Sequence, residues 1–201
     1  AFPFLGYQPG NEASENCFRL YGEYMGPDYE AIPSSIISQG DSTWCGAGDR
    51  GDAAMLAYGA ARYLLAKGDR QVAGKVMPIV EWCLEYCHRQ LNADGVVASD
   101  SDELENRFPS GDANLCTSCL YYDALLSAAY LNDALGQSHR KSSVWRKRAA
   151  ELASNIEVYF GRNVQGYETY RYYAGNDILR SWICIPLTVG IMNRAEQTIK
   201  A

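Results

Sequence analysis

Acidic side chains gather in three stretches of the chain, each placed just before an apolar, helix-like run. The stretches cover residues 26–51, 92–112 and 161–176. Carboxyl groups in pairs can act as general acid and general base, provided that their surroundings set different pKa values. The first candidates for chemistry are chosen from the acids in or directly after these stretches: Asp41, Asp49, Asp52, Asp100, Asp102, Glu103, Glu105, Asp112, Glu168 and Asp177.

Asp49 differs from the other acids in its neighbours. It lies three residues before an expected helix, among glycines and close to Trp44, where partial burial would raise its pKa. We therefore take Asp49 as a catalytic or substrate-binding candidate. Asp52, Asp112 and Asp177 lie where helices are expected to begin, and a carboxylate there caps free N–H groups. Capping lowers the pKa, which suits a base or a hydrogen-bond acceptor for a sugar hydroxyl.

The densest acidic cluster is "DSDELENR", residues 100–107. A solvated loop would explain its composition, and so would a calcium loop, although Leu104 stands where a calcium loop of the EF-hand type needs Asp or Asn. The third interpretation is catalytic: Glu103 or Glu105 reaches into a cleft while Arg107 keeps a neighbouring carboxylate ionised. We take Glu103 and Glu105 as the catalytic candidates here.

Aromatic and polar side chains accompany these acids. Sugar rings stack on aromatic faces, so "YETYRYY" at residues 167–173 could form the wall of a subsite. Arg180 stands nearly alone in an apolar run, where it needs an anionic partner or a cavity. The predicted substrate-binding residues are Trp44, Arg50, Asp52, Arg107, Asp112, Tyr170, Asn176, Asp177 and Arg180.

Helical periodicity dominates the elements that must position these residues, and strand signals are nearly absent. Three segments are amphipathic with one apolar face, which predicts solvent-facing helices: 11–25, 72–91 and 141–159. Three others are apolar nearly all round, which predicts buried helices: 53–66, 114–135 and 178–192. The two kinds alternate strictly along the chain.

The connections alternate as well. Short turns lead from each buried helix to the next exposed one, whereas the acidic stretches lead from exposed helices to buried ones. Because paired helices run antiparallel, the long loops should meet at one end of the molecule. "GDA" recurs at 51–53 and 111–113, 60 residues apart, which marks a repeat of one helical hairpin. The sequence predicts an all-α fold, an α/α toroid or an arc of one, with about three hairpins.

Bulk composition narrows the classes of function. The net charge of -6 and the lack of any Lys/Arg run argue against nucleic-acid binding. The longest uncharged stretch, 181–193, is too short to cross a bilayer, so we expect a soluble protein of the cytoplasm or periplasm. The cysteine pairs 83/87 and 116/119 fit helix faces and are expected to be buried thiols rather than redox or zinc ligands. No metal or cofactor is predicted.

Three segments together resemble one family. "WCGAGDRGDAAM" (44–55), "SDSDELENRFPSGDANLCT" (99–117) and "YYAGNDILRSWICIPLTVG" (172–190) are similar to loops that enter inner helices in six-hairpin glycosidases. That superfamily includes glucoamylase-like, rhamnosidase-like and glycogen-debranching-like enzymes. The resemblance spans most of residues 36–192.

The resemblance implies glycoside hydrolysis of an oligo- or polysaccharide, by an inverting mechanism with two carboxylates. It also implies an (α/α)6 toroid, and residues 1–201 hold about three of its six hairpins. We therefore expect one toroid-like domain that is about half of a larger one.

Two other classes of function remain open. Other toroid enzymes, the sugar epimerases and polysaccharide lyases, commonly use histidine bases. His88 and His139 lie on or beside exposed helices, outside the acidic loops. A helical-repeat scaffold that binds a glycan or a protein at its concave end is the non-enzymatic alternative.

Overall fold

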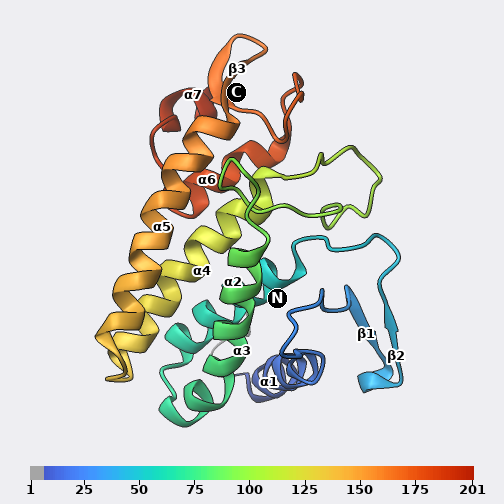
Figure 1. Cartoon of the computed structure of the whole chain (residues 1–201), viewed down its shortest axis with the longest axis vertical. Coiled ribbons are helices and arrows are strands. Elements are labelled where there is room, and N and C mark those ends of the chain that lie inside the picture. Colours follow the sequence, from blue (N-terminus) through green and yellow to red (C-terminus); the bar gives the residue numbers. More distant parts are fainter. Residues whose placement is uncertain (1–6) are drawn as a thin grey trace.

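Two antiparallel helix pairs form the body of the molecule (Figure 1). The computed structural model describes residues 7–201, and their structure is mostly helical. One pair is α2 (Asp52–Lys67) and α3 (Arg70–Arg89), and the other is α4 (Leu115–Ala134) and α5 (His139–Phe160). These four helices agree with the expected segments to within a few residues.

Burial follows the pattern predicted for these four helices. Helix α4 is buried nearly all round, because it packs against both α2 and α5. Small residues such as Ala57, Ala60 and Ala128 are fully buried and allow the close approach of α2 and α4. Helices α3 and α5 bury one face each. The alternation of inner and outer helices is therefore confirmed over these two pairs.

The third buried helix, expected over 178–192, does not form. The segment contains a short 3-10 turn, η2 (Ser181–Cys184), and one helical turn, α6 (Ile185–Thr188). Arg180 precedes them in an extended conformation, and Gly190 ends them at φ 89°. Pro186 lacks an N–H and is tolerated only in the first turn of a helix, which is its position in α6, so a continuous helix cannot run through it. The apolar composition led us to overlook this proline. The described residues thus show two helix pairs in a mostly helical chain, and the toroid stays a prediction.

Small hairpins, which the sequence did not predict, occupy two of the long loops. Strands β1 (Ser35–Ile37) and β2 (Ser42–Trp44) pair around the 3-10 turn η1 (Ser38–Gly40), and β3 (Gly161–Val164) pairs with β4 (Tyr167–Tyr170). The β1–β2 hairpin lies away from the α2–α5 body in Figure 1. Helices α1 (Gln8–Gly22) and α7 (Ala195–Lys200) complete the described chain.

The long loops meet at one end of the helices, as predicted. The backbone N–H groups of Asp100 and Ser101 both donate to the carbonyl oxygen of Asp49, which joins the first loop to the second. The N–H of Leu115 donates to the carbonyl of Tyr172, which joins the second loop to the third. The short α2–α3 and α4–α5 turns lie toward the opposite end (Figure 1).

Candidate active site

Asp49 lies at the start of α2, where it caps the helix. Its Oδ1 accepts hydrogen bonds from the N–H groups of Gly51 (2.8 Å) and Asp52 (3.3 Å). Its Oδ2 accepts from the hydroxyl of Tyr86 on α3 at 2.6 Å. Burial raises the pKa of Asp49, as the sequence led us to expect, and these three hydrogen bonds oppose the rise. Asp49, rather than Asp52, is thus the capping carboxylate of this helix.

Arg50 is the centre of a buried polar network. Its guanidinium forms ion pairs with Asp52 (2.9 Å) and Glu105 (2.9 Å), and it also donates to the carbonyl of Ser34 at 2.6 Å. Asp52 is only 7% exposed and accepts a further hydrogen bond from the Ser34 hydroxyl. The Arg50 network therefore ties Glu105 of the second loop to the start of α2.

Glu103 differs from Glu105, which is two residues away and is paired with Arg50. The Oε1 atom of Glu103 is buried and has no hydrogen-bond partner among the described residues. Burial raises the pKa of Glu103 to about 7, against a lowering by the backbone N–H of Glu103 itself. The charge of Asp102 adds a smaller rise in this pKa, and that of Arg50 a smaller lowering. A carboxyl group with this pKa carries its proton over much of the neutral range, so it can act as a general acid.

Asp102 and Tyr172 connect Glu103 to the third loop. The Tyr172 hydroxyl donates to Oδ2 of the buried Asp102 at 2.9 Å, and Oδ1 of Asp102 accepts from the N–H of Leu104. Sequence reasoning had favoured Glu103 over Asp102, and it missed the bond to Tyr172. Tyr86 and Ser34 were also missed, because their roles depend on contacts across 37 and 18 residues with Asp49 and Asp52.

The exposed members of the predicted set lie around this network. Trp44 on β2 is 37% exposed, and the Arg50 guanidinium carbon lies 5.8 Å from the centroid of its ring. Arg107, Asp112 and Asp177 are exposed. Asp112 does not cap α4, because the Asn114 side chain does so by accepting from the N–H of Thr117 at 2.9 Å.

Three further predictions about the third loop need correction. Tyr170 is fully buried in β4, where its hydroxyl donates to Glu157, so its ring is not placed to contact a substrate. Asn176 and Asp177 do not begin a helix. The Asn176 side chain instead accepts from the N–H of Tyr172 at 3.0 Å and shapes the loop. Arg180 lies on aromatic rings rather than on a buried helix.

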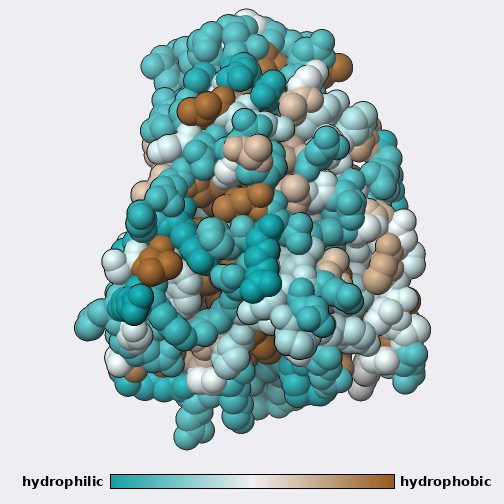
Figure 2. All heavy atoms as spheres, viewed as in Figure 1, coloured by the Kyte–Doolittle hydropathy of each residue, from teal (hydrophilic) through white to brown (hydrophobic). Residues whose placement is uncertain are grey.

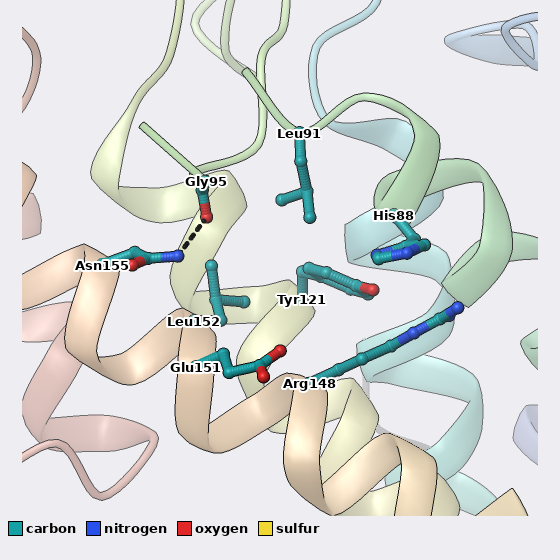
Figure 3. A pocket seen from close by; sticks show the side chains of 8 residues that line it. All are labelled: His88, Leu91, Gly95, Tyr121, Arg148, Glu151, Leu152 and Asn155. Carbon is teal, nitrogen blue, oxygen red and sulfur yellow. Dashed lines mark hydrogen bonds between the residues drawn. The ribbon is translucent and has the colours of Figure 1, made fainter. Parts of the chain in front are cut away.

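A separate small pocket contains the histidine that the alternative enzyme classes would need (Figure 3). His88 of α3, Tyr121 of α4 and Arg148 of α5 line it, and its volume is about 60 Å³. Burial lowers the pKa of His88, with a further lowering by Arg148, so the imidazole is neutral at pH 7. Sites for sugar-sized ligands enclose roughly 300 Å³ or more, so this pocket is too small for a pyranose.

Four of the free thiols are buried in the helical core. Cys83, Cys87, Cys116 and Cys119 are buried and free, as predicted, and burial raises the pKa of each thiol. In the face drawn in Figure 2, hydrophobic residues are scattered among hydrophilic ones. Within residues 7–201, no cluster of three or more His, Cys, Asp or Glu side chains could hold a metal ion. No helix in that range is long and apolar enough to cross a membrane.

Comparisons with known proteins assign no family to this arrangement. The chain matches no protein-family model, and a search of curated proteins finds no match.

Proposed function

We propose that the chain belongs to a glycoside hydrolase and that the bond is cleaved at the end of the helices where the long loops meet. The observation that carries this proposal is the carboxyl group of Glu103, with its raised pKa and its buried oxygen without a partner. Glycoside hydrolysis needs an acid that is protonated at the working pH, beside a second carboxylate that is ionised. The resemblance to six-hairpin glycosidases supports the same reaction.

The second carboxylate in this proposal is Glu105. Its ion pair with the Arg50 guanidinium, at 2.9 Å, holds the carboxylate in place two residues after Glu103. Asp49 fits this role less well, because three hydrogen bonds already occupy its oxygens. Asp49 then positions the loop, through its cap on α2 and its bond to Tyr86.

In the proposed reaction, Glu103 gives its proton to the glycosidic oxygen as the bond from that oxygen to the anomeric carbon breaks. Glu105 accepts a proton from a water molecule, and the resulting hydroxide oxygen bonds to the anomeric carbon from the opposite face. Each turnover leaves Glu103 ionised and Glu105 protonated, and proton exchange with solvent restores both. Trp44 and Phe108, which are exposed at this end, supply faces on which sugar rings can stack.

The test is a panel of 4-nitrophenyl glycosides and natural oligosaccharides, assayed with the parent chain, Glu103→Gln and Asp94→Asn. Asp94 is an exposed acid in the second loop and serves as the matched control. We expect Glu103→Gln to lose at least 100-fold in kcat/KM on natural glycosides, and less on 2,4-dinitrophenyl glycosides, whose leaving group needs little protonation. Asp94→Asn should retain activity.

Equal losses on both kinds of leaving group would remove Glu103 from the role of acid. Binding of glycans without any hydrolysis would favour the scaffold alternative. Activity that depends on His88 instead would favour an epimerase or a lyase, which the small pocket of Figure 3 does not support.

A further inference from the structure

Arg180 is a half-buried cation held by aromatic rings instead of by acids. Its guanidinium carbon lies 5.4 Å from the ring centroid of Phe108, 5.6 Å from that of Tyr172 and 5.7 Å from that of Tyr173. Within residues 7–201, its side chain takes part in no hydrogen bond or ion pair. The exposed acids Asp112 and Asp177 of the neighbouring loops form no ion pair with it.

The three rings leave the hydrogen-bonding capacity of Arg180 unused. Ring faces attract the positive charge, but they do not satisfy the planar fork of five N–H donors. That fork matches a carboxylate, which can accept two parallel hydrogen bonds from it. Arg50 shows the other arrangement in this molecule, since both of its terminal nitrogens donate to Asp52, Glu105 or the Ser34 carbonyl and only Nε has no partner among the described residues.

Arg180 is connected to the loop of the proposed acid through Tyr172. The ring of Tyr172 is shared, because Arg180 packs on it and its hydroxyl donates to Asp102, the residue before Glu103. Phe108, on whose ring Arg180 packs, belongs to the same loop as Glu103 and is 54% exposed. The loop that carries Glu103 therefore also carries an exposed aromatic ring, and Tyr172 joins this loop to a guanidinium that has no hydrogen-bond partner among the described residues.

We propose that Arg180 recognises the carboxylate of an acidic sugar, so that the substrate of this site contains a uronate residue. This inference rests on the proposed function, because it assigns a substrate class to the same site. Phe108 and Tyr173 stack against the sugar ring, and the Arg180 fork fixes its carboxylate. A neutral hexose would leave the fork without a partner.

The test compares four probes by isothermal titration: D-glucuronate, D-galacturonate, D-glucuronamide and D-glucose. We expect a uronate to bind at least tenfold more tightly than the amide and the neutral hexose. Arg180→Gln should abolish this preference, whereas Arg180→Lys, which keeps a cation over the rings, should keep part of it. Arg140→Gln is the control, because Arg140 is an exposed arginine at the opposite end of the helices. Melting temperatures of the variants check that each is folded.

Equal binding of uronate and amide, or a preference that survives Arg180→Gln, would overturn the inference. The inference would also be overturned if none of the four probes bound at 100 mM ionic strength, or if Arg140→Gln reduced the preference for uronate as much as Arg180→Gln does. If neutral glycosides are hydrolysed in a reaction that depends on Glu103, and no uronate is preferred, the substrate class is wrong and the proposed function stands. If a uronate is preferred in a way that requires Arg180, but nothing is hydrolysed, the recognition of uronate stands and the proposed function is wrong.

Discussion

The network around Arg50 and the side chains of Glu103 and Arg180 lie in the same loops, yet they differ in how their polar groups are satisfied. Arg50, Asp52 and Asp49 exchange hydrogen bonds and ion pairs with one another or with fixed neighbours, and only Nε of Arg50 is left without a partner in this group. Glu103 keeps a buried oxygen without a partner, and Arg180 has only ring faces. Satisfied groups stabilise a fold, whereas unsatisfied ones are available to a ligand. We call Asp49, Arg50 and Asp52 the supporting part of the acidic loops, and Glu103 and Arg180 the reactive part.

The largest effect should follow from breaking the supporting part. Asp52→Ala removes the buried partner of Arg50, and breaking a buried ion pair on one side costs about 3–5 kcal/mol. We expect the free energy of unfolding, measured by urea denaturation, to fall by about 3 kcal/mol. Asp112→Ala is the matched control, since it changes the exposed aspartate of the second Gly-Asp-Ala and should cost less than about 0.5 kcal/mol. Equal losses would mean that the two aspartates do not differ as described.

The next effect concerns the glycine that lets Asp49 reach back to α2. Gly51 has φ 80°, and a Cβ there would lie 2.4 Å from Oγ1 of Thr117 on α4. Gly51→Ala should cost about 1–2 kcal/mol for the left-handed backbone and about 1–3 kcal/mol for the overlap. Gly68→Ala has a similar φ of 69° with open space around the Cβ, so it should show only the first of these losses. Thermal or urea unfolding of the two variants, compared in one buffer, measures the difference.

A smaller effect, of the opposite sign, should come from the reactive part. The folded pKa of Glu103 is about 7, above the ordinary value of 4.5, so its contribution to stability is complete below pH 4.5 and is lost as the pH rises through 7. Glu103→Gln removes this dependence. At pH 8 we expect the variant to be more stable than the parent by roughly 1–2 kcal/mol, after allowance for solvent screening.

At pH 4 the parent and Glu103→Gln should have the same free energy of unfolding, since the carboxyl group is protonated there. Urea denaturation from pH 4 to pH 8 gives the profile of the difference. A parent that is more stable than the variant at pH 8 would show that the Glu103 carboxylate has a partner after all.

Sequence reasoning recovered the elements that periodicity controls. The α2, α3, α4 and α5 segments carry strong helical patterns, and their alternation placed the acidic loops at one end. Sequence reasoning failed where composition and local geometry disagree. Pro186 interrupts the apolar 178–192 segment, and the hairpins within the loops carry little alternation.

The candidate site was predictable by residue type but not by partner. Asp49, Glu103 and Glu105 were identified from their positions in the loops. Their partners lie on other segments of the chain: Tyr86 of α3 donates to Asp49, and Arg50 of the first loop pairs with Glu105. Sequence spacing does not encode such contacts, so the satisfied Asp49 and the unsatisfied Glu103 looked alike.

The smallest expected effect tests whether Glu105 belongs to the reactive part. Its side chain is 34% exposed, and Arg50 keeps Asp52 and the Ser34 carbonyl when Glu105 is removed. Glu105→Gln should therefore cost about 0.5 kcal/mol in the free energy of unfolding, and less in 1 M NaCl, because an exposed pair is weak and is screened by salt. Glu23→Gln, which breaks a more exposed pair with Arg19, sets the lower bound in the same urea series. A loss above about 2 kcal/mol would place Glu105 in the supporting part with Asp52, and the base in the proposed reaction would then have to be another carboxylate.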